Sequence, residues 1–109
     1  MRNEIIVGKM LNYINKIMFY SQGLNYRSFS DNSITVDACV FNLSQLGELT
    51  TKLDKDFISA HPDIPWNEMR GLRNRIVHDY EGVNLKLVWE IVSKDLPELK
   101  KLLEDISQN

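Results

Sequence analysis

Residues 73–80, RNRIVHDY, gather side chains that could act together on a phosphodiester. An arginine presents a planar fork of N–H donors that matches phosphate oxygens, and it keeps its charge at any working pH. A histidine titrates near neutral pH, so it can take or give a proton during bond cleavage. An asparagine can orient either group, and a tyrosine can donate a hydrogen bond or stack on a base. One chemistry that this combination supports is the cleavage of RNA without a metal ion.

The same residues also have a purely structural interpretation, which remains open from their types alone. Arg75 and Asp79 are four apart, and such a pair on a helix surface contributes roughly 0.2–0.5 kcal/mol. Basic residues near the end of a helix complement its dipole. His78 could be a half-buried residue bonded to a carbonyl, and Tyr80 could serve packing.

A helix is expected to position this segment. Two prolines within residues 60–66, AHPDIPW, prevent a continuous helix there, and Pro65 suits the first turn of a new one. We expect this helix to run from Pro65 to about Tyr80 or Glu81. Gly82 is then placed to act as its left-handed C-terminal cap.

Helical geometry predicts that one copy of this segment makes an incomplete site. Arg73 and Tyr80 are seven apart and share a stripe, whereas Arg73 and His78 are five apart, which is about 140° around an ideal helix. The arginine and the histidine would therefore flank a groove. Two copies related by a twofold axis could line a shared cleft with two arginines and two histidines, so we expect a homodimer.

Apolar residues also recur at helical spacing outside this segment. We expect one helix at about 3–22, ended by Gly23, and a second at about 32–54. The residues between them are expected to form a loop whose Ser, Asp and Asn side chains provide N-caps.

The last periodic segment begins at Leu85 and contains Pro97, which removes a helical hydrogen bond. A kink or break is therefore expected around Asp95. No alternating run with turn signals argues for a sheet. The predicted fold is all-α, an antiparallel bundle of four to five amphipathic helices in a single domain over residues 1–109.

The charge of the chain limits how it could handle nucleic acid. The net charge is −2, which argues against a protein that coats nucleic acid without specificity. Positive charge is concentrated locally instead. Residues 70–80 contain three arginines, Arg70, Arg73 and Arg75, and only one acidic residue, Asp79.

The chain has one cysteine, Cys39, which cannot form an intramolecular disulfide and is expected to pack in the core. With two histidines and no ligand-like spacing, neither a metal site nor a cofactor is expected. No stretch approaches the roughly 18 consecutive apolar residues of a membrane span. A reducing, cytoplasmic setting without membrane attachment fits these features.

The motif and its context resemble a known family. Arg73-Asn74, followed by His78 and Tyr80, resembles the Arg-Asn-x-x-x-His-x-Tyr motif of HEPN domains, specifically of the HepT-like group. The likeness covers nearly the whole chain. It includes the Gly-Glu pair of the family's second helix, its Ile-Pro-Trp loop and its closing Trp and Asp-Leu-Pro segment, found here in FNLSQLGEL (41–49), DIPWNEMRGLRNRIVHDY (63–80) and VWEIVSKDLPELK (88–100).

This resemblance implies a HEPN fold and a homodimer with a cleft where the paired motifs meet. It also implies a metal-independent endoribonuclease, the toxin of a toxin–antitoxin pair. The implied partner is a minimal nucleotidyltransferase of the MNT type. In some members that antitoxin attaches AMP to the motif tyrosine, here Tyr80. Each added phosphate would bring negative charge into a cleft that must accept RNA.

The resemblance also implies a role for each motif residue. Arg73 would stabilise the phosphate and the transition state, and His78 would act as general acid or base. Asn74 would orient these groups, and Tyr80 would be the modification site and a wall of the cleft.

Several other polar and aromatic residues are better explained by structure. Trp66 and Trp89 are assigned to packing, and Asp37, Ser44 and Glu48 form a polar stripe that is expected to face solvent rather than the cleft. Two alternative functions stay open. One is a non-catalytic HEPN subunit that presents a nucleotide or substrate to a nucleotidyltransferase, and the other is a purely structural dimeric bundle.

Overall fold

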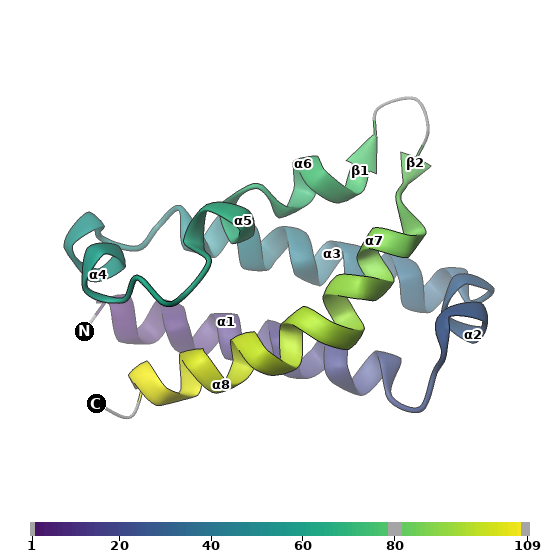
Figure 1. Ribbon diagram of the computed structural model, residues 1–109, viewed down its shortest axis with the longest axis horizontal. Coiled ribbons are helices and arrows are strands. Elements are labelled where there is room, and N and C mark those ends of the chain that lie inside the picture. The colour runs from purple at the N-terminus through teal and green to yellow at the C-terminus, as the bar shows by residue number, and fades with distance from the viewer. Residues whose placement is uncertain (1, 79–81, 108–109) are drawn as a thin grey trace.

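The computed structural model describes residues 2–78 and 82–107, with the backbone but not the side chain of His78. Three helical stretches run along the long axis of the molecule, which measures 40 × 30 × 19 Å (Figure 1). Helix α1 (Arg2–Ser21) packs against α3 (Ser33–Thr50) and against α8 (Leu96–Ser107). The start of α1 and the end of α8 lie at the same end of the molecule.

Helix α1 confirms the helix expected at about 3–22. Five of its residues at helical spacing are buried against the rest of the protein: Ile6, Val7, Met10, Ile14 and Ile17. The helix ends at Ser21, and Gly23 follows with a φ of 77°, in the left-handed region that glycine adopts without steric cost. The prediction that Gly23 ends this helix is therefore confirmed.

The segment between the two long helices was expected to be a loop, and this prediction is wrong in part. Residues Tyr26–Ser30 form a short helix, α2, because Asn25 and Ser28 make a reciprocal capping box at its start. Its Phe29 is fully buried, with its ring 5.1 Å from that of Trp89. Asn32 then caps α3 by accepting a hydrogen bond from the Thr35 amide, so the expected N-capping role of these polar residues is confirmed.

Helix α3 is shorter than the predicted 32–54, and its buried face differs from the stripe that the spacing predicted. Leu46 is buried as expected, but Ile34 and Phe41, which were expected on the same stripe, are 81% and 60% exposed, and Val36 and Leu43 are buried instead. Cys39 lies on this buried face in the core, as predicted, and burial raises the pKa of its thiol to about 11. At Gly47 the backbone of residues 69–70 comes very close to α3. An added Cβ there would lie 2.7 Å from the carbonyl oxygen of Met69.

Residues 55–70 fold into two short helices joined by a proline-containing turn. Helix α4 (Lys55–Ala60) ends before the turn, and α5 (Trp66–Arg70) begins after Pro65. The buried Trp66 indole donates a hydrogen bond to the His61 carbonyl at 2.9 Å and closes the turn. Both tryptophans therefore serve packing, as the sequence indicated.

The single helix predicted from Pro65 to about Tyr80 or Glu81 does not form. Helix α5 ends before Gly71, α6 (Leu72–Ile76) follows, and the chain then becomes extended. Strand β1 (Val77–His78) pairs antiparallel with β2 (Gly82–Val83), which makes a two-residue ladder.

The C-terminal helix is continuous but changes its winding. Helix α7 (Leu85–Glu90) passes through a π-helical turn, η1 (Ile91–Asp95), into α8. The amide of Leu96 donates to the carbonyl of Ile91, five residues back. Pro97 has no N–H to continue the ordinary α-helical pattern. The break that was one form of the disturbance predicted around Asp95 is absent, since the helix continues, and the disturbance takes the form of a π-turn.

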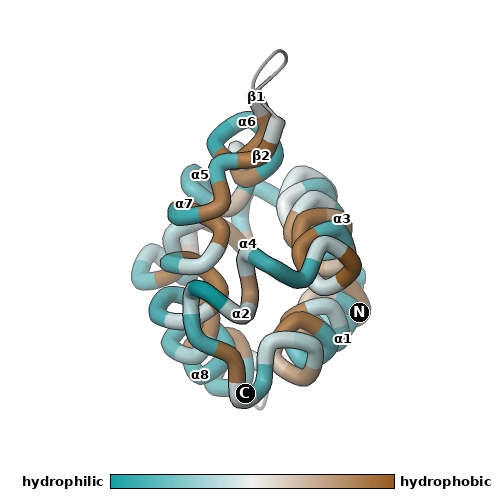
Figure 2. The backbone as a smooth tube through the Cα atoms, turned by 90° about the vertical axis from the view of Figure 1, so that its right-hand side faces the viewer, coloured by the Kyte–Doolittle hydropathy of each residue, from teal (hydrophilic) through white to brown (hydrophobic). Residues whose placement is uncertain are grey.

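Seen along its long axis, the molecule has α1 and α3 on one side and α7 with α8 on the other, and α5 and α6 lie across the top (Figure 2). The apolar side chains of these elements form one core cluster. The fold of the described residues is all-α apart from the short ladder, and its helical segments are more numerous and shorter than the four to five helices expected. No helix of the described part is long and apolar enough to cross a membrane.

Candidate functional site

The motif arginine and asparagine lie on the short helix α6. Leu72 and Ile76 are four apart on its inner side and are buried, with exposed fractions of 4% and 0%. They hold α6 against α3, so the three polar residues between them, Arg73, Asn74 and Arg75, are exposed. The local pattern of one apolar, three polar and one apolar residue is enough to place these side chains in solvent.

The helix ends before it reaches His78. Val77 has φ −113° and ψ 123°, which is extended backbone, and it lies opposite Val83 in the ladder. The amide of Asn84 donates to the carbonyl of Ile76 at 2.8 Å, so a residue beyond the hairpin bonds one of the last helical carbonyls. These contacts replace the next helical turn.

This ending overturns the helical geometry that was expected for the motif. Arg73 and His78 are not related by 140° around one helix, because His78 belongs to β1. Gly82 does have a left-handed φ, 78°, but it lies opposite His78 in the ladder and does not cap a helix. The backbone of His78 is thereby held by pairing rather than by helical hydrogen bonds.

Some predictions fall outside the residues that the structure describes. These are the position of Tyr80, the ion pair between Arg75 and Asp79, and the direction of the His78 side chain. Within the described ranges, the side chains of Arg73 and Asn74 are exposed, and for His78 the structure describes the backbone alone.

Three arginines are exposed around the start of the motif. Arg70 lies at the end of α5, and Arg73 and Arg75 lie on α6. No hydrogen bond or ion pair joins their guanidinium groups to another described side chain. They are therefore available to an anion such as a phosphate.

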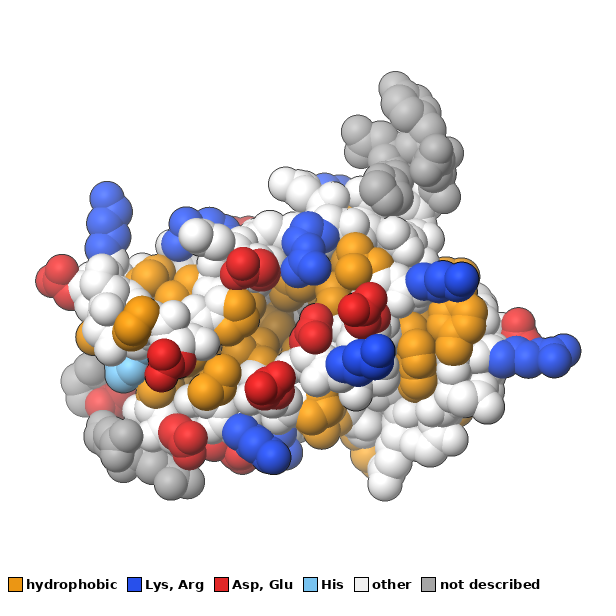
Figure 3. All heavy atoms as spheres, viewed as in Figure 1, with side chains coloured by type: hydrophobic (Ala, Val, Ile, Leu, Met, Phe, Trp, Pro, Cys, Tyr) orange, Lys and Arg blue, Asp and Glu red, His pale blue; other side chains and the backbone are white. Residues whose placement is uncertain are grey.

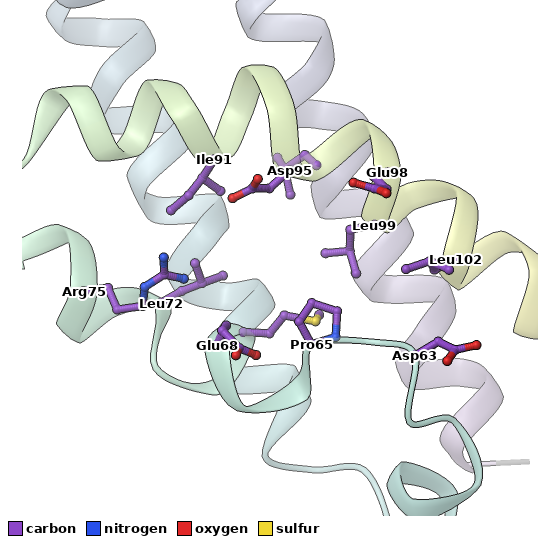
Figure 4. Close-up of a pocket in the computed structure, with 12 residues that line it drawn as sticks. Asp63, Pro65, Glu68, Leu72, Arg75, Ile91, Asp95, Glu98, Leu99 and Leu102 are labelled. Atoms are coloured by element: carbon purple, nitrogen blue, oxygen red, sulfur yellow. The ribbon is translucent and has the colours of Figure 1, made fainter.

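A groove opens on another side of α6, and its position was not predicted. It has a volume of about 470 Å³ and lies between the α5–α6 segment and the η1–α8 stretch (Figure 4). Arg75 lines it, whereas Arg73 does not. The walls come from residues about thirty positions apart in the chain, so no local pattern in the sequence marks the groove.

The polar stripe of α3 is exposed or half-buried, as expected. Asp37 and Glu48 are exposed, and the half-buried Ser44 hydroxyl donates to the Val40 carbonyl at 2.9 Å. Among the residues that the structure describes, no group of three or more His, Cys, Asp or Glu side chains is arranged to hold a metal ion.

Comparisons with known proteins connect this arrangement to a family. A family model described as "Ribonuclease HepT-like" matches residues 10–106, a range that contains α6, both strands and the groove. No solved structure matches the chain significantly.

Curated relatives cover most of the chain. One from Methanocaldococcus jannaschii, named "Putative RNase MJ1380", is 34% identical over 95 residues, which are 87% of this chain and 87% of the relative. One from Caldanaerobacter subterraneus subsp. tengcongensis, named "Putative RNase TTE0752", is 34% identical over 87 residues, or 80% and 78% of the two chains. A third, "Probable ribonuclease HepT" from Thermococcus cleftensis, is 31% identical over 87 residues and covers 80% and 79%.

Proposed function

The chain belongs to the HepT-like ribonuclease family, and we propose that it is a metal-independent endoribonuclease whose site is completed by a second copy of the chain. The resemblance seen in the sequence is confirmed at the level of the family. The observation that carries the proposal is the exposure of Arg73 and Asn74 on a helix anchored by Leu72 and Ile76, with His78 two residues beyond its end.

The reaction assigns one task to each side chain. A base removes the proton of an RNA 2′-hydroxyl, whose oxygen attacks the adjacent phosphorus, while the bond from phosphorus to the 5′-oxygen breaks and that oxygen takes up a proton. His78 serves as one of these proton carriers, since an imidazole titrates near neutral pH. Arg73 stabilises the charge that builds up on the phosphate oxygens, and Asn74 orients the reacting groups. The products are a 2′,3′-cyclic phosphate and a 5′-hydroxyl.

Two copies are proposed because one α6 supplies only one set of these groups. A candidate surface for the pairing lies on α3, the helix against which α6 packs. Ile34 and Phe41 are seven apart on this helix, and they are 81% and 60% exposed. Large apolar side chains exposed at helical spacing favour contact with another protein surface. We therefore assign the twofold contact between the two copies to this surface.

Control of the activity is assigned to a nucleotidyltransferase of the MNT type, so the chain acts as the toxin of a toxin–antitoxin pair. Addition of AMP to Tyr80 would bring negative charge into the motif segment and hinder the approach of an RNA phosphate. Support for this part comes from the motif, since Tyr80 lies outside the described residues.

The test is bacterial growth during expression of this chain alone, compared with His78→Ala at equal expression. The native chain should arrest growth, and RNA from the arrested cells should carry new 2′,3′-cyclic phosphate ends. His78→Ala should do neither while keeping the same helical content and mass in solution. Purified protein should cut RNA in the presence of excess EDTA.

The second candidate is a subunit that holds a nucleotide without cutting RNA. The same exposed arginines favour it, because they would equally bind the phosphates of ATP or AMP. Harmless expression of the folded native chain, together with tight ATP binding in calorimetry, would replace the nuclease proposal with this one.

A further inference from the structure

The groove beside α6 combines an apolar floor with an acidic rim. Its floor is formed by six apolar side chains: Met69, Leu72, Ile91, Leu96, Leu99 and Leu102. In the space-filling view, hydrophobic side chains gather in a hollow on this face, and several acidic side chains border it, with some basic side chains among them (Figure 3). The hollow is thus an apolar surface inside a charged border.

The acidic residues stand on both walls of the groove. Asp63 and Glu68 come from the wall that leads into and forms α5, and Asp95 and Glu98 come from the opposite wall, η1 and α8 (Figure 4). All four are exposed, and none has an ion pair with another described residue. Among the residues that the structure describes, Arg75 is the single basic one that lines the groove. Four carboxylates against one guanidinium make this a negatively charged site.

This charge decides which partners the groove can accept. RNA and anionic lipid surfaces carry negative phosphates, which four carboxylates repel. A lysine or arginine of another protein would find carboxylates of opposite charge to pair with on either wall. The volume of about 470 Å³ lies within the roughly 300–1,000 Å³ of sites that enclose a small ligand, so it suits a few anchoring side chains.

We propose that this groove docks a helical segment of a partner protein, with aliphatic side chains inserted against Leu99 and Leu102 and with lysine or arginine residues that pair with Asp95 and Glu98. An amphipathic helix laid in an apolar groove binds through anchors on one face. The site goes beyond the proposed RNA cleavage. A docked segment would contact Leu72 and Arg75 of α6, the helix that carries Arg73 elsewhere on its surface.

The test is selection of random 16-residue peptides displayed on phage against the full chain. Selected peptides should be enriched in aliphatic residues and in lysine or arginine, placed three or four positions apart as on one face of a helix. Synthetic copies should bind about tenfold more weakly to the groove variant Asp95→Asn/Glu98→Gln, since truncated charge pairs and anchors dominate such contacts. Leu102→Asn should weaken binding to a similar extent.

The matched control is Glu4→Gln/Asp56→Asn, which removes the same two charges from exposed sites outside the groove. It should leave peptide affinity within about twofold, because exposed charges that do not line the groove are screened by water and salt. Equal loss in both double variants would mean general attraction to an acidic protein and would overturn the proposal. No enrichment, or enrichment of peptides without basic residues, would overturn it as well.

One further outcome identifies a different occupant. If the groove variants change the mass of the protein in solution, the groove is filled by a second copy of the chain, and the partner proposal fails. None of these measurements uses RNA cleavage, so the result is independent of the nuclease proposal.

Discussion

The pair of long helices α1 and α3 and the segment from His61 to Asn84 are built in different ways. Each long helix carries a continuous buried stripe, and the two pack along most of their length. In the segment, α5 and α6 have five residues each and bury two each, and the chain then turns back in a two-residue ladder. Short elements of this kind depend on tertiary packing for their stability.

The candidate site therefore lies on the segment, whose conformation depends less on its own local sequence than on packing against other elements. The exposed arginines and the groove both belong to the segment or border it, while α3 supplies the surface on which the segment rests. Gly47 is a point of close approach between the two parts, since a residue without a Cβ lets the Met69 carbonyl come near. The long helices therefore set the position of the site, and the segment provides its chemistry.

The largest expected effect is on the rate of RNA cleavage, which should fall much more when Arg73 is replaced than when Arg75, on the same helix α6, is replaced. Arg73→Gln should lower the cleavage rate of total bacterial RNA by roughly 10²–10³-fold, the usual cost of removing one group that stabilises transition-state charge. Arg75→Gln should lower it by about tenfold or less, because it removes at most one phosphate contact. Cleavage is followed by the appearance of 5′-hydroxyl ends. Equal losses in both variants would show that α6 acts as a general cationic surface.

The next effect tests whether α3 makes the site shared. Ile34→Ser/Phe41→Ser should convert a dimer into a monomer and lower RNA cleavage by about 100-fold, because each monomer keeps only its own groups. Light scattering measures the mass. The matched control is Ile5→Ser/Phe19→Ser on α1, whose side chains are 60% and 73% exposed. These two residues are fourteen positions apart, about 21 Å along the helix, so they form no shared patch and their replacement should leave the dimer intact. A native chain that is already monomeric and cuts RNA would contradict the shared cleft.

Cys39 reports on the integrity of the core between the long helices. Burial raises the pKa of its thiol from 9.0 to about 11, so at pH 8 the folded protein has about 100-fold less thiolate than the unfolded chain. Alkylation by iodoacetamide should be slower by at least that factor, as mass spectrometry can follow. Rapid alkylation of the native protein would mean that this part of the core opens readily.

The same shift predicts a loss of stability in alkali. Between pH 9 and 11 the unfolded thiol is ionised and the folded one is not, so unfolding releases a proton in this window. The contribution of Cys39 to the free energy of unfolding should therefore fall as the pH rises from about 9. Comparison of urea unfolding for the native protein and Cys39→Ala isolates this contribution, and parallel pH profiles would refute it.

The smallest effect probes the contact between α3 and α5. Gly47→Ala should destabilise the protein by about 1–3 kcal/mol, because the added methyl group meets the backbone carbonyl of Met69 at 2.7 Å and that backbone must move. Gly8→Ala, on α1 with open space around it, should instead stabilise the protein by roughly 0.5–1 kcal/mol. Thermal unfolding of the two variants measures both. A neutral Gly47→Ala would show that α5 is loosely held.

The helices that could be predicted from the sequence are those with long periodic stripes. The expected 3–22 became Arg2–Ser21, and the expected 32–54 became Ser33–Thr50. Helix α2 was missed because five residues are too few to show a period, although its capping pair, Asn25 and Ser28, was visible. The irregularity before Pro97 was predictable, since it follows from the chemistry of one residue.

The end of α6 could not be predicted in the same way. The residues after Ile76 contain no glycine or proline until Gly82, so the sequence favoured a continued helix. Pairing of Val77 with Val83 and the hydrogen bond from the Asn84 amide to the Ile76 carbonyl decide the outcome instead. β-branched residues on both sides of the turn, Ile76, Val77 and Val83, were the available signal.

The sequence by itself determined the all-α class, the long helices, the family and the motif residues, because periodicity, capping and residue chemistry act over a few neighbouring positions. The exposure of Arg73 and Asn74 follows from a local pattern once α6 has formed, since they stand between two buried apolar residues of this short helix. Only the tertiary structure decided that the helix stops before His78 and that an acid-rimmed groove forms beside it. Both depend on contacts between segments, since the groove lies between the α5–α6 segment and the η1–α8 stretch, which are far apart in the chain (Figure 4).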